Sequence, residues 1–110
     1  MITGIVSDDF HLSPAEFEHT VRRAREEFET AGIGDGDTVA LLLRNDASFL
    51  VAMTALGRSG IYAATLNWQS HPDEVAYVLN DCGARAVLIE DGLIERFAAA
   101  LPSTVTVYAM

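Results

Sequence analysis

The chain has 110 residues, half of them apolar, and a net charge of −9 from sixteen acidic and seven basic residues. This length fits one domain or part of one, and the acidity opposes binding to nucleic-acid backbones and anionic membranes. The sequence shows no apolar run near 18 residues, no basic leader typical of a secretory signal, and a single cysteine, which excludes an internal disulfide. We therefore expect a cytoplasmic protein without a membrane span.

The first segment predicts a short N-terminal hairpin, with an arm over residues 2–7, a turn at Asp8-Asp9 and a second arm over residues 10–12. Ser13-Pro14-Ala15-Glu16 is typical of a helix start, because serine caps, proline suits the first helical position and glutamate follows three residues after the cap. The helix is expected to reach Ala31, since one face carries Phe17, Val21, Ala24, Phe28 and Ala31. On its outer face, Glu18–Arg22 and Arg25–Glu29 have the spacing of helix-stabilising pairs.

Residues 32–37 (GIGDGD) form a glycine-rich segment. A phosphate-binding loop follows a strand and opens a helix, whereas these glycines follow a helix and precede a strand. We interpret Gly32 as the helix C-cap and the remainder as a turn.

The stretch from Asp37 to Asn67 reads as strand, helix and strand. Thr38–Leu43 has the pattern of a strand buried on both faces, and Asn45 and Asp46 are candidate helix caps. The helix over residues 47–57 lacks charged side chains, which predicts that it is enclosed on most sides. Gly60 closes it in a left-handed turn, and residues 61–66 return as a second strand in a parallel crossover.

The loop over residues 67–71 leaves the carboxyl end of that strand, where ligands of open parallel sheets usually bind. Trp68 is therefore a candidate for ligand recognition, although packing is the other interpretation. A helix follows from Pro72, capped by Ser70 or His71, with Val75, Val78, Leu79 and Cys82 on its inner face.

The last third predicts a strand over residues 86–89, a turn at residues 90–92, a helix over residues 93–101 stopped by Pro102, and a strand over residues 104–108. The predicted fold is α/β: a mostly parallel sheet of about four strands with helices on both faces, preceded by the N-terminal hairpin.

The sequence lacks the residues that several catalytic and metal-binding mechanisms require. All seven basic residues are arginine, which removes lysine-dependent mechanisms. His11, His19 and His71 lack metal-ligand spacing and are expected at the surface, and Cys82 is expected to be a small core residue. Asp8-Asp9 could bind magnesium in a receiver-like regulator, but the lysine of such a domain is missing, and we favour the turn.

Several segments together carry a resemblance. Ser13 to Phe17 (SPAEF), Gly32 to Asn45 (GIGDGDTVALLLRN), Leu56 to Asn67 (LGRSGIYAATLN) and Pro72 to Ala86 (PDEVAYVLNDCGARA) occur in this order over most of the chain. They resemble the opening of acyl-CoA synthetases, which belong to the adenylate-forming, AMP-binding enzymes.

The resemblance implies a longer parent ligase that uses ATP and magnesium to activate a carboxylic acid, closest to members acting on fatty acids, and transfers it to coenzyme A. It implies no catalytic, metal-binding or cofactor-binding residue within residues 1–110, because the phosphate loop and the catalytic lysine come later in the family. Some members carry a basic residue near the coenzyme A phosphates where this chain has Gln69. The neutral Gln69 amide can donate a hydrogen bond there but brings no charge, which argues against the phosphate-binding role. Trp68 and Gln69 are the candidate substrate-binding residues.

The leading hypothesis is that residues 1–110 are the first part of the N-terminal domain of such a ligase, inactive alone, with the rest of the parent enzyme as partner. The alternative is a stand-alone binding or dimerisation module derived from a truncated synthetase. Such a module could form a homodimer, because the apolar helix over residues 47–57 would then need a partner to cover it.

Overall fold

The computed structural model describes residues 13–44 and 46–109. The expected hairpin, Asp8-Asp9, His11 and the cap at Asn45 lie outside these residues. The described elements follow one another as α1 (Pro14–Thr30), β1 (Thr38–Leu42), α2 (Asp46–Arg58), β2 (Tyr62–Thr65), α3 (Pro72–Cys82), β3 (Ala86–Ile89), η1 (Asp91–Leu93), α4 (Ile94–Phe97), η2 (Ala98–Ala100) and β4 (Thr106–Ala109). Among them, no helix is both long and apolar enough to cross a membrane.

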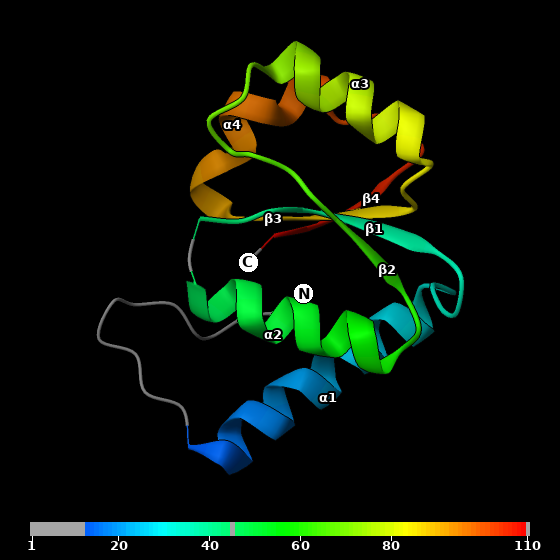
Figure 1. Cartoon of the computed structure of the whole chain (residues 1–110), viewed down its shortest axis with the longest axis vertical. Helices are drawn as coiled ribbons and strands as arrows, with labels where there is room; N and C mark the ends of the chain where they lie inside the picture. Colours follow the sequence, from blue (N-terminus) through cyan, green and yellow to red (C-terminus); the bar gives the residue numbers. More distant parts are fainter. Residues whose placement is uncertain (1–12, 45, 110) are drawn as a thin grey trace.

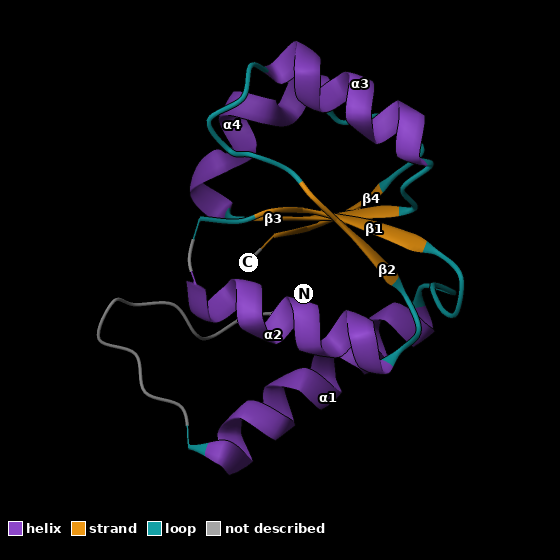
Figure 2. Cartoon of the chain, viewed as in Figure 1, coloured by secondary structure: helices purple, strands orange, loops and turns teal. Residues whose placement is uncertain are grey.

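The four described strands form one sheet in the order β2-β1-β3-β4, with every neighbouring pair parallel. Helices α1 and α2 cover one face of this sheet, and α3 with α4 covers the other (Figures 1 and 2). The expected α/β class with helices on both faces is confirmed. The chain runs from β1 outward to β2, and then crosses back over β1 to reach β3 on its other side.

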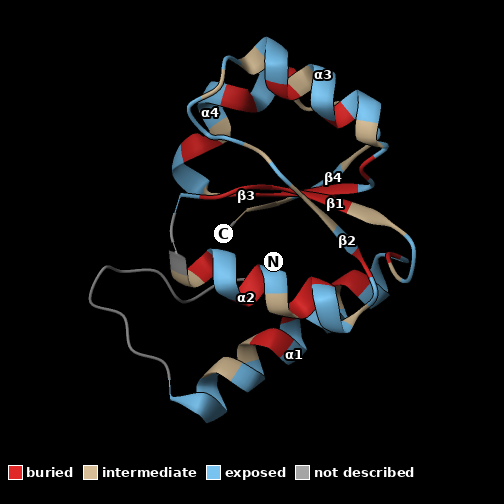
Figure 3. Cartoon of the chain, in the orientation of Figure 1, coloured by how far each residue is buried: buried red, intermediate tan, exposed pale blue. Residues whose placement is uncertain are grey.

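The core consists of two apolar layers, one on each face of the sheet (Figure 3). Successive residues of β1 point to opposite layers: Val39 and Leu41 pack toward α1 and α2, while Ala40 and Leu42 pack toward α3 and α4. Strand β3 is buried over its whole length, whereas the edge strands β2 and β4 are only partly covered. The continuous apolar run at residues 39–43 is thus explained by burial on both faces.

The helix ends follow the local sequence signals. The Ser13 hydroxyl accepts a hydrogen bond from the Glu16 backbone N–H at 3.1 Å, and the Glu16 carboxylate accepts one from the Ser13 N–H at 3.3 Å. At the end of α1, Gly32 has φ +75° and donates to the Glu29 carbonyl, while Ile33 donates to the Phe28 carbonyl. This is a Schellman motif.

The end of α2 repeats this motif. Gly60 has φ +70° and donates to the Gly57 carbonyl, and Ile61 donates to the Leu56 carbonyl. The glycines at residues 32 and 60 were therefore sufficient to predict where α1 and α2 end.

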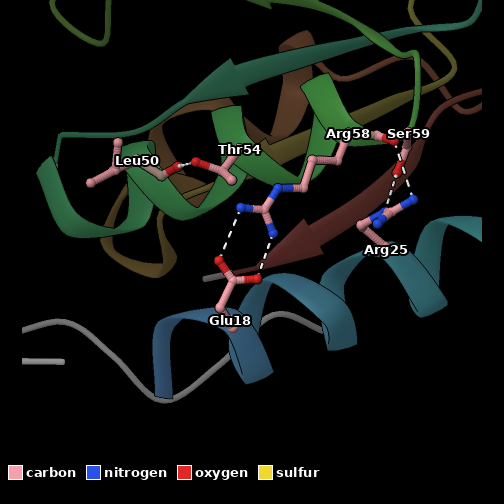
Figure 4. Close-up of polar contacts among 6 residues, drawn as sticks. All are labelled: Glu18, Arg25, Leu50, Thr54, Arg58 and Ser59. Carbon is pink, nitrogen blue, oxygen red and sulfur yellow. Dashed lines mark hydrogen bonds and ion pairs between the residues drawn. The ribbon is translucent and has the colours of Figure 1, made fainter. Parts of the chain in front are cut away.

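Helix α2 differs from the expectation that it is enclosed on most sides. Phe49, Leu50 and Met53 on its outer side are exposed, and the Leu50 side chain reaches 58% exposure. The reason is that α1 contacts the opposite end of the helix: Arg58 binds Glu18, and Arg25 donates to the Ser59 hydroxyl and the Arg58 carbonyl (Figure 4). Glu18 thus forms its ion pair across two helices with Arg58, and the charge of Arg22 on its own helix makes a smaller contribution to the lowered pKa of Glu18.

Smaller corrections concern the other helices and the last strand. Val78 on α3 is exposed, whereas its neighbours Val75 and Leu79 are buried as expected. The single helix expected over residues 93–101 is instead one α-turn between two 3₁₀ turns. Strand β4 begins two residues later than expected, because the Val105 N–H donates to the Pro102 carbonyl in a turn.

Candidate functional site

The candidate site lies at the carboxyl edge of the sheet, between the ends of β1 and β3. The connections that leave these two strands go to opposite faces of the sheet, which makes this position the topological switch point of the fold. Open α/β sheets generally bind ligands in the crevice at this point. The first charged residues after the strands here are Arg44, two residues after the end of β1, and Glu90, directly after β3.

Glu90 fixes the position of Arg44. One Glu90 carboxylate oxygen accepts the Arg44 backbone N–H at 2.8 Å, and the other accepts the side-chain Nε–H at 2.7 Å. The Glu90 side chain is 14% exposed, whereas the Arg44 side chain is 41% exposed. The carboxylate therefore lies beneath the guanidinium, which faces the solvent.

Trp68 joins this pair from the loop after β2. The Arg44 guanidinium carbon lies 5.6 Å from the centroid of the indole ring, within the range of a cation–π contact, and the residue is 37% exposed. The sequence left two interpretations of Trp68, packing and ligand recognition. In the structure the indole ring packs against the Arg44 guanidinium and is still accessible to solvent. Its role in substrate binding stays a prediction.

The loop that carries Trp68 is held by three hydrogen bonds. The Asn67 side-chain oxygen accepts the Gln69 N–H at 2.9 Å, the Asn67 carbonyl accepts the Ser70 N–H at 3.0 Å, and Arg96 donates to the Ser70 carbonyl at 3.0 Å. His71 then caps α3 by accepting the Asp73 N–H at its Nδ1, 3.1 Å away. The Gln69 side chain is exposed, and its substrate-binding role also stays a prediction.

Sequence reasoning missed Arg44, Glu90 and Arg96. The first two could have been found, because each is the first charged residue after a wholly buried strand, and the carboxyl ends of neighbouring parallel strands meet at one edge. Arg96 offered no such signal, because its partner is a backbone carbonyl in a distant loop.

The other sequence-predicted groups lie away from this edge or have structural roles. His19 is exposed on α1, and Cys82 packs against the core layer beneath α3, where its thiol donates to the Leu79 carbonyl. Within residues 13–44 and 46–109, no three side chains of histidine, cysteine, aspartate or glutamate are placed to hold a metal ion.

A second concave region lies between α1 and β4, lined by Arg23, Glu26, Glu27, Thr30, Ala31 and Tyr108. The Tyr108 ring meets Phe28 edge-on, with centroids 5.8 Å apart, and burial raises the pKa of its hydroxyl above the ordinary value. The lining carries charges of both signs, and none of the sequence-predicted candidates belongs to it.

Comparison with known proteins assigns the fold to a family. Residues 2–109 match the family model described as AMP-binding enzyme. A fatty acid–[acyl-carrier-protein] ligase of Streptomyces coeruleorubidus is 29% identical over 97 residues, which are 86% of this chain and 19% of that ligase. This chain therefore spans about a fifth of the length of that relative.

Two solved structures share the fold. A benzoate CoA ligase of Burkholderia xenovorans LB400 superposes with a TM-score of 0.87 at 22% identity, over 98% of this chain and 22% of that chain. The O-succinylbenzoate coenzyme A synthetase of Bacillus subtilis, solved in complex with ATP and magnesium ion, has a TM-score of 0.79 at 25% identity, over 96% of this chain and 28% of that chain. From the match over residues 2–109, the chain belongs to the family of AMP-binding enzymes.

Proposed function

We propose that this chain is the first part of the N-terminal domain of a longer acid–CoA ligase. The observation that carries the proposal is the combination of a family match over residues 2–109 with coverage of only 19% of a curated relative. In the parent enzyme, ATP and magnesium would activate the acid as an acyl-adenylate, and a thiol would then displace AMP. The remainder of the enzyme is the main partner, and the compartment is the cytoplasm.

The substrate class is a fatty acid, and the acceptor is coenzyme A. Support comes from the named activities of relatives, which include medium- and long-chain fatty-acid–CoA ligases of mycobacteria. The Streptomyces relative is named for transfer to an acyl carrier protein, whose acceptor group would also be a thiol. Thioester formation is the step common to both kinds of relative.

Residues 1–110 alone are expected to be inactive and to act as scaffold for the rest of the ligase. The chain has no lysine, so the lysine chemistry that the family resemblance implies must come from elsewhere in the parent. The test is acid-dependent ATP–pyrophosphate exchange by the purified 110-residue chain, with a full-length family member as positive control. We expect no exchange, and any acid-dependent exchange would contradict the proposal.

The intact mass of the gene product in its source cells tests the parent itself. A product several times heavier than 11.9 kDa is expected. A native product of 11.9 kDa would contradict the proposal that the chain is part of a longer ligase, and with it the adenylation activity.

A second candidate function, a binding or dimerisation module, is favoured by one feature. Phe49, Leu50 and Met53 form an exposed apolar strip on the outer side of α2. In such a module, a second copy would cover this strip. Sedimentation of the chain separates the two functions: a concentration-independent monomer argues against the module, and a dimer that Leu50→Glu dissociates supports it.

A further inference from the structure

Three strands deliver side chains to a single point at the switch of the sheet. Arg44 follows β1, Trp68 follows β2 by a few residues, and Glu90 follows β3. Their contacts join distant segments, since Trp68 lies 24 residues after Arg44 and Glu90 lies 46 residues after it. The fold, not the local sequence, brings these groups together.

The Arg44 guanidinium is oriented and still able to donate. Glu90 accepts the Nε–H at 2.7 Å, so the ion pair occupies one edge of the planar group. Within residues 13–44 and 46–109, the two Nη atoms have no hydrogen-bond acceptor and are left as donors. A planar fork of this kind matches the oxygens of carboxylate and phosphate groups. Because a shielded carboxylate already fixes the guanidinium, little side-chain entropy is lost when an anion binds.

Gly92 provides the room for this arrangement. A Cβ atom at Gly92 would lie 2.8 Å from Nη2 of Arg44, closer than side-chain carbons approach. The Trp68 ring, which is 37% exposed, borders the guanidinium on another side. The site thus offers fixed N–H donors next to an accessible aromatic surface.

We propose that Arg44 and Trp68 bind the oxyanion group, phosphate or carboxylate, of a small ligand at the switch point of the sheet. The Nη atoms of Arg44 donate to the oxyanion, and the indole ring contacts the planar or apolar part next to it. Glu90 is a positioning residue that holds the guanidinium. The inference rests on the geometry of this chain and stands whether or not the chain is part of a ligase.

Trp68 reports on the site directly, because it is the only tryptophan in the sequence. The experiment is a titration of Trp68 fluorescence in the 110-residue chain with sodium pyrophosphate and, separately, with sodium octanoate. Sodium chloride at matched ionic strength serves as the salt control. We expect a saturable change in emission at millimolar concentrations of at least one probe, beyond that caused by chloride.

The two probes distinguish the source of the oxyanion. A response to pyrophosphate alone identifies a phosphate site, a response to octanoate alone identifies a carboxylate site, and responses to both identify a general oxyanion site. If chloride reproduces the whole change, or if neither probe changes the emission, the proposal is overturned.

The variants assign the response to Arg44. Arg44→Gln should weaken binding at least tenfold, and Arg44→Lys, which keeps the charge without the fork, should weaken it by less. Arg85→Gln is the matched control, because it removes the same charge from the Arg85–Asp37 pair before β1 and β3, and it should titrate like the unchanged chain.

Gly92→Ala keeps Arg44 but moves its guanidinium, and it should also weaken binding. This variant together with Arg44→Lys keeps the test decisive if Arg44→Gln fails to fold. Titrations of the Arg44 and Gly92 variants that match that of the unchanged chain would overturn the proposal.

Discussion

At the amino edge of the sheet, Arg85 binds Asp37 at 3.3 Å, and at the carboxyl edge Arg44 binds Glu90 at 2.7 Å. The two pairs join the same two strands, β1 and β3, from opposite ends. At the amino edge, backbone hydrogen bonds from Gly36 to Gly60 and from Tyr62 to Asp37 already tie the turns together. At the carboxyl edge, backbone hydrogen bonds from Leu66 to Leu41 and from Glu90 to Leu42 end at the strands. Beyond them side chains link the loops: Glu90 accepts the Arg44 N–H, and Arg96 donates to the Ser70 carbonyl.

This difference indicates why the two edges suit different tasks. Turns closed by backbone hydrogen bonds leave little freedom for a ligand, so the amino edge is a structural boundary. Loops joined through side chains can exchange one partner for another while the strands stay in place. The carboxyl edge therefore combines a rigid base with replaceable contacts, and substitutions at and between the two edges test this comparison.

The largest effect is expected at the amino edge from Gly60→Ala. Gly60 has φ +70°, and a Cβ there would collide with the Asp35 carboxylate. The left-handed backbone and the displaced carboxylate together should lower the free energy of unfolding by about 2 kcal/mol. Urea denaturation followed by far-UV circular dichroism measures this loss.

Gly36→Ala is the matched control for that change, because Gly36 also has a positive φ, +85°, but has open space at the Cβ position. It should cost about 1 kcal/mol, from the backbone alone. Equal losses for the two variants would show that the contact between Gly60 and Asp35 does not matter.

The next effect concerns the two carboxylates. Glu90→Gln should cost about 1 kcal/mol, because two charge-assisted hydrogen bonds to Arg44 are weakened at a mostly buried side chain. It should also change the emission of Trp68, which contacts the same guanidinium. Asp37→Asn at the amino edge should cost less and leave the emission unchanged; the reverse order would contradict the comparison.

A smaller effect of opposite sign is expected from Gly57→Ala in α2, the helix that connects the two edges. Nothing lies within 4 Å of a Cβ placed at Gly57. Replacing a helical glycine by alanine should raise the free energy of unfolding by about 0.5–1 kcal/mol. A loss of stability in urea denaturation would indicate a steric role for this glycine.

The smallest effect should come from the exposed ion pair between α1 and α2. The Arg58 guanidinium, which donates to both Glu18 carboxylate oxygens, lowers the pKa of Glu18 below its ordinary value of 4.5. The contribution of the Glu18–Arg58 ion pair to stability is therefore fully present above pH 4.5. It is lost as the pH falls through the lowered pKa that Glu18 has in the folded chain. Carbon-13 NMR titration of the Glu18 carboxyl should show this lowered pKa, and Arg58→Gln should return it toward 4.5.

The helix ends show how far local signals reach. The capping box at Ser13 and the glycines at residues 32 and 60 were read correctly, because capping requires hydrogen bonds only within the same few residues. The exposure of Leu50 and Val78 was read wrongly. An apolar side chain marks a possible inner face, but the neighbouring elements decide which faces they cover.

The candidate site also combines a feature that the sequence predicts with contacts that only the fold decides. Trp68 could be selected from the sequence, because it follows a strand at the edge where parallel sheets bind ligands. Arg44 could be selected in the same way, as a charged residue that follows a buried strand, but its contact with the Trp68 ring could not be predicted, because that contact depends on which strands become neighbours. The order β2-β1-β3-β4 decides that Arg44 meets both Trp68 and Glu90.

The sequence by itself determined the three long helices, the four described strands, the parallel α/β class and the family resemblance, since each depends on short-range periodicity, turn residues and the order of segments. The tertiary structure alone decided which side chains meet at the carboxyl edge, which side of α2 remains exposed, and that Glu18 pairs with Arg58. These contacts join residues 24 to 46 positions apart, and their formation depends on strand order and helix packing, which no local pattern specifies.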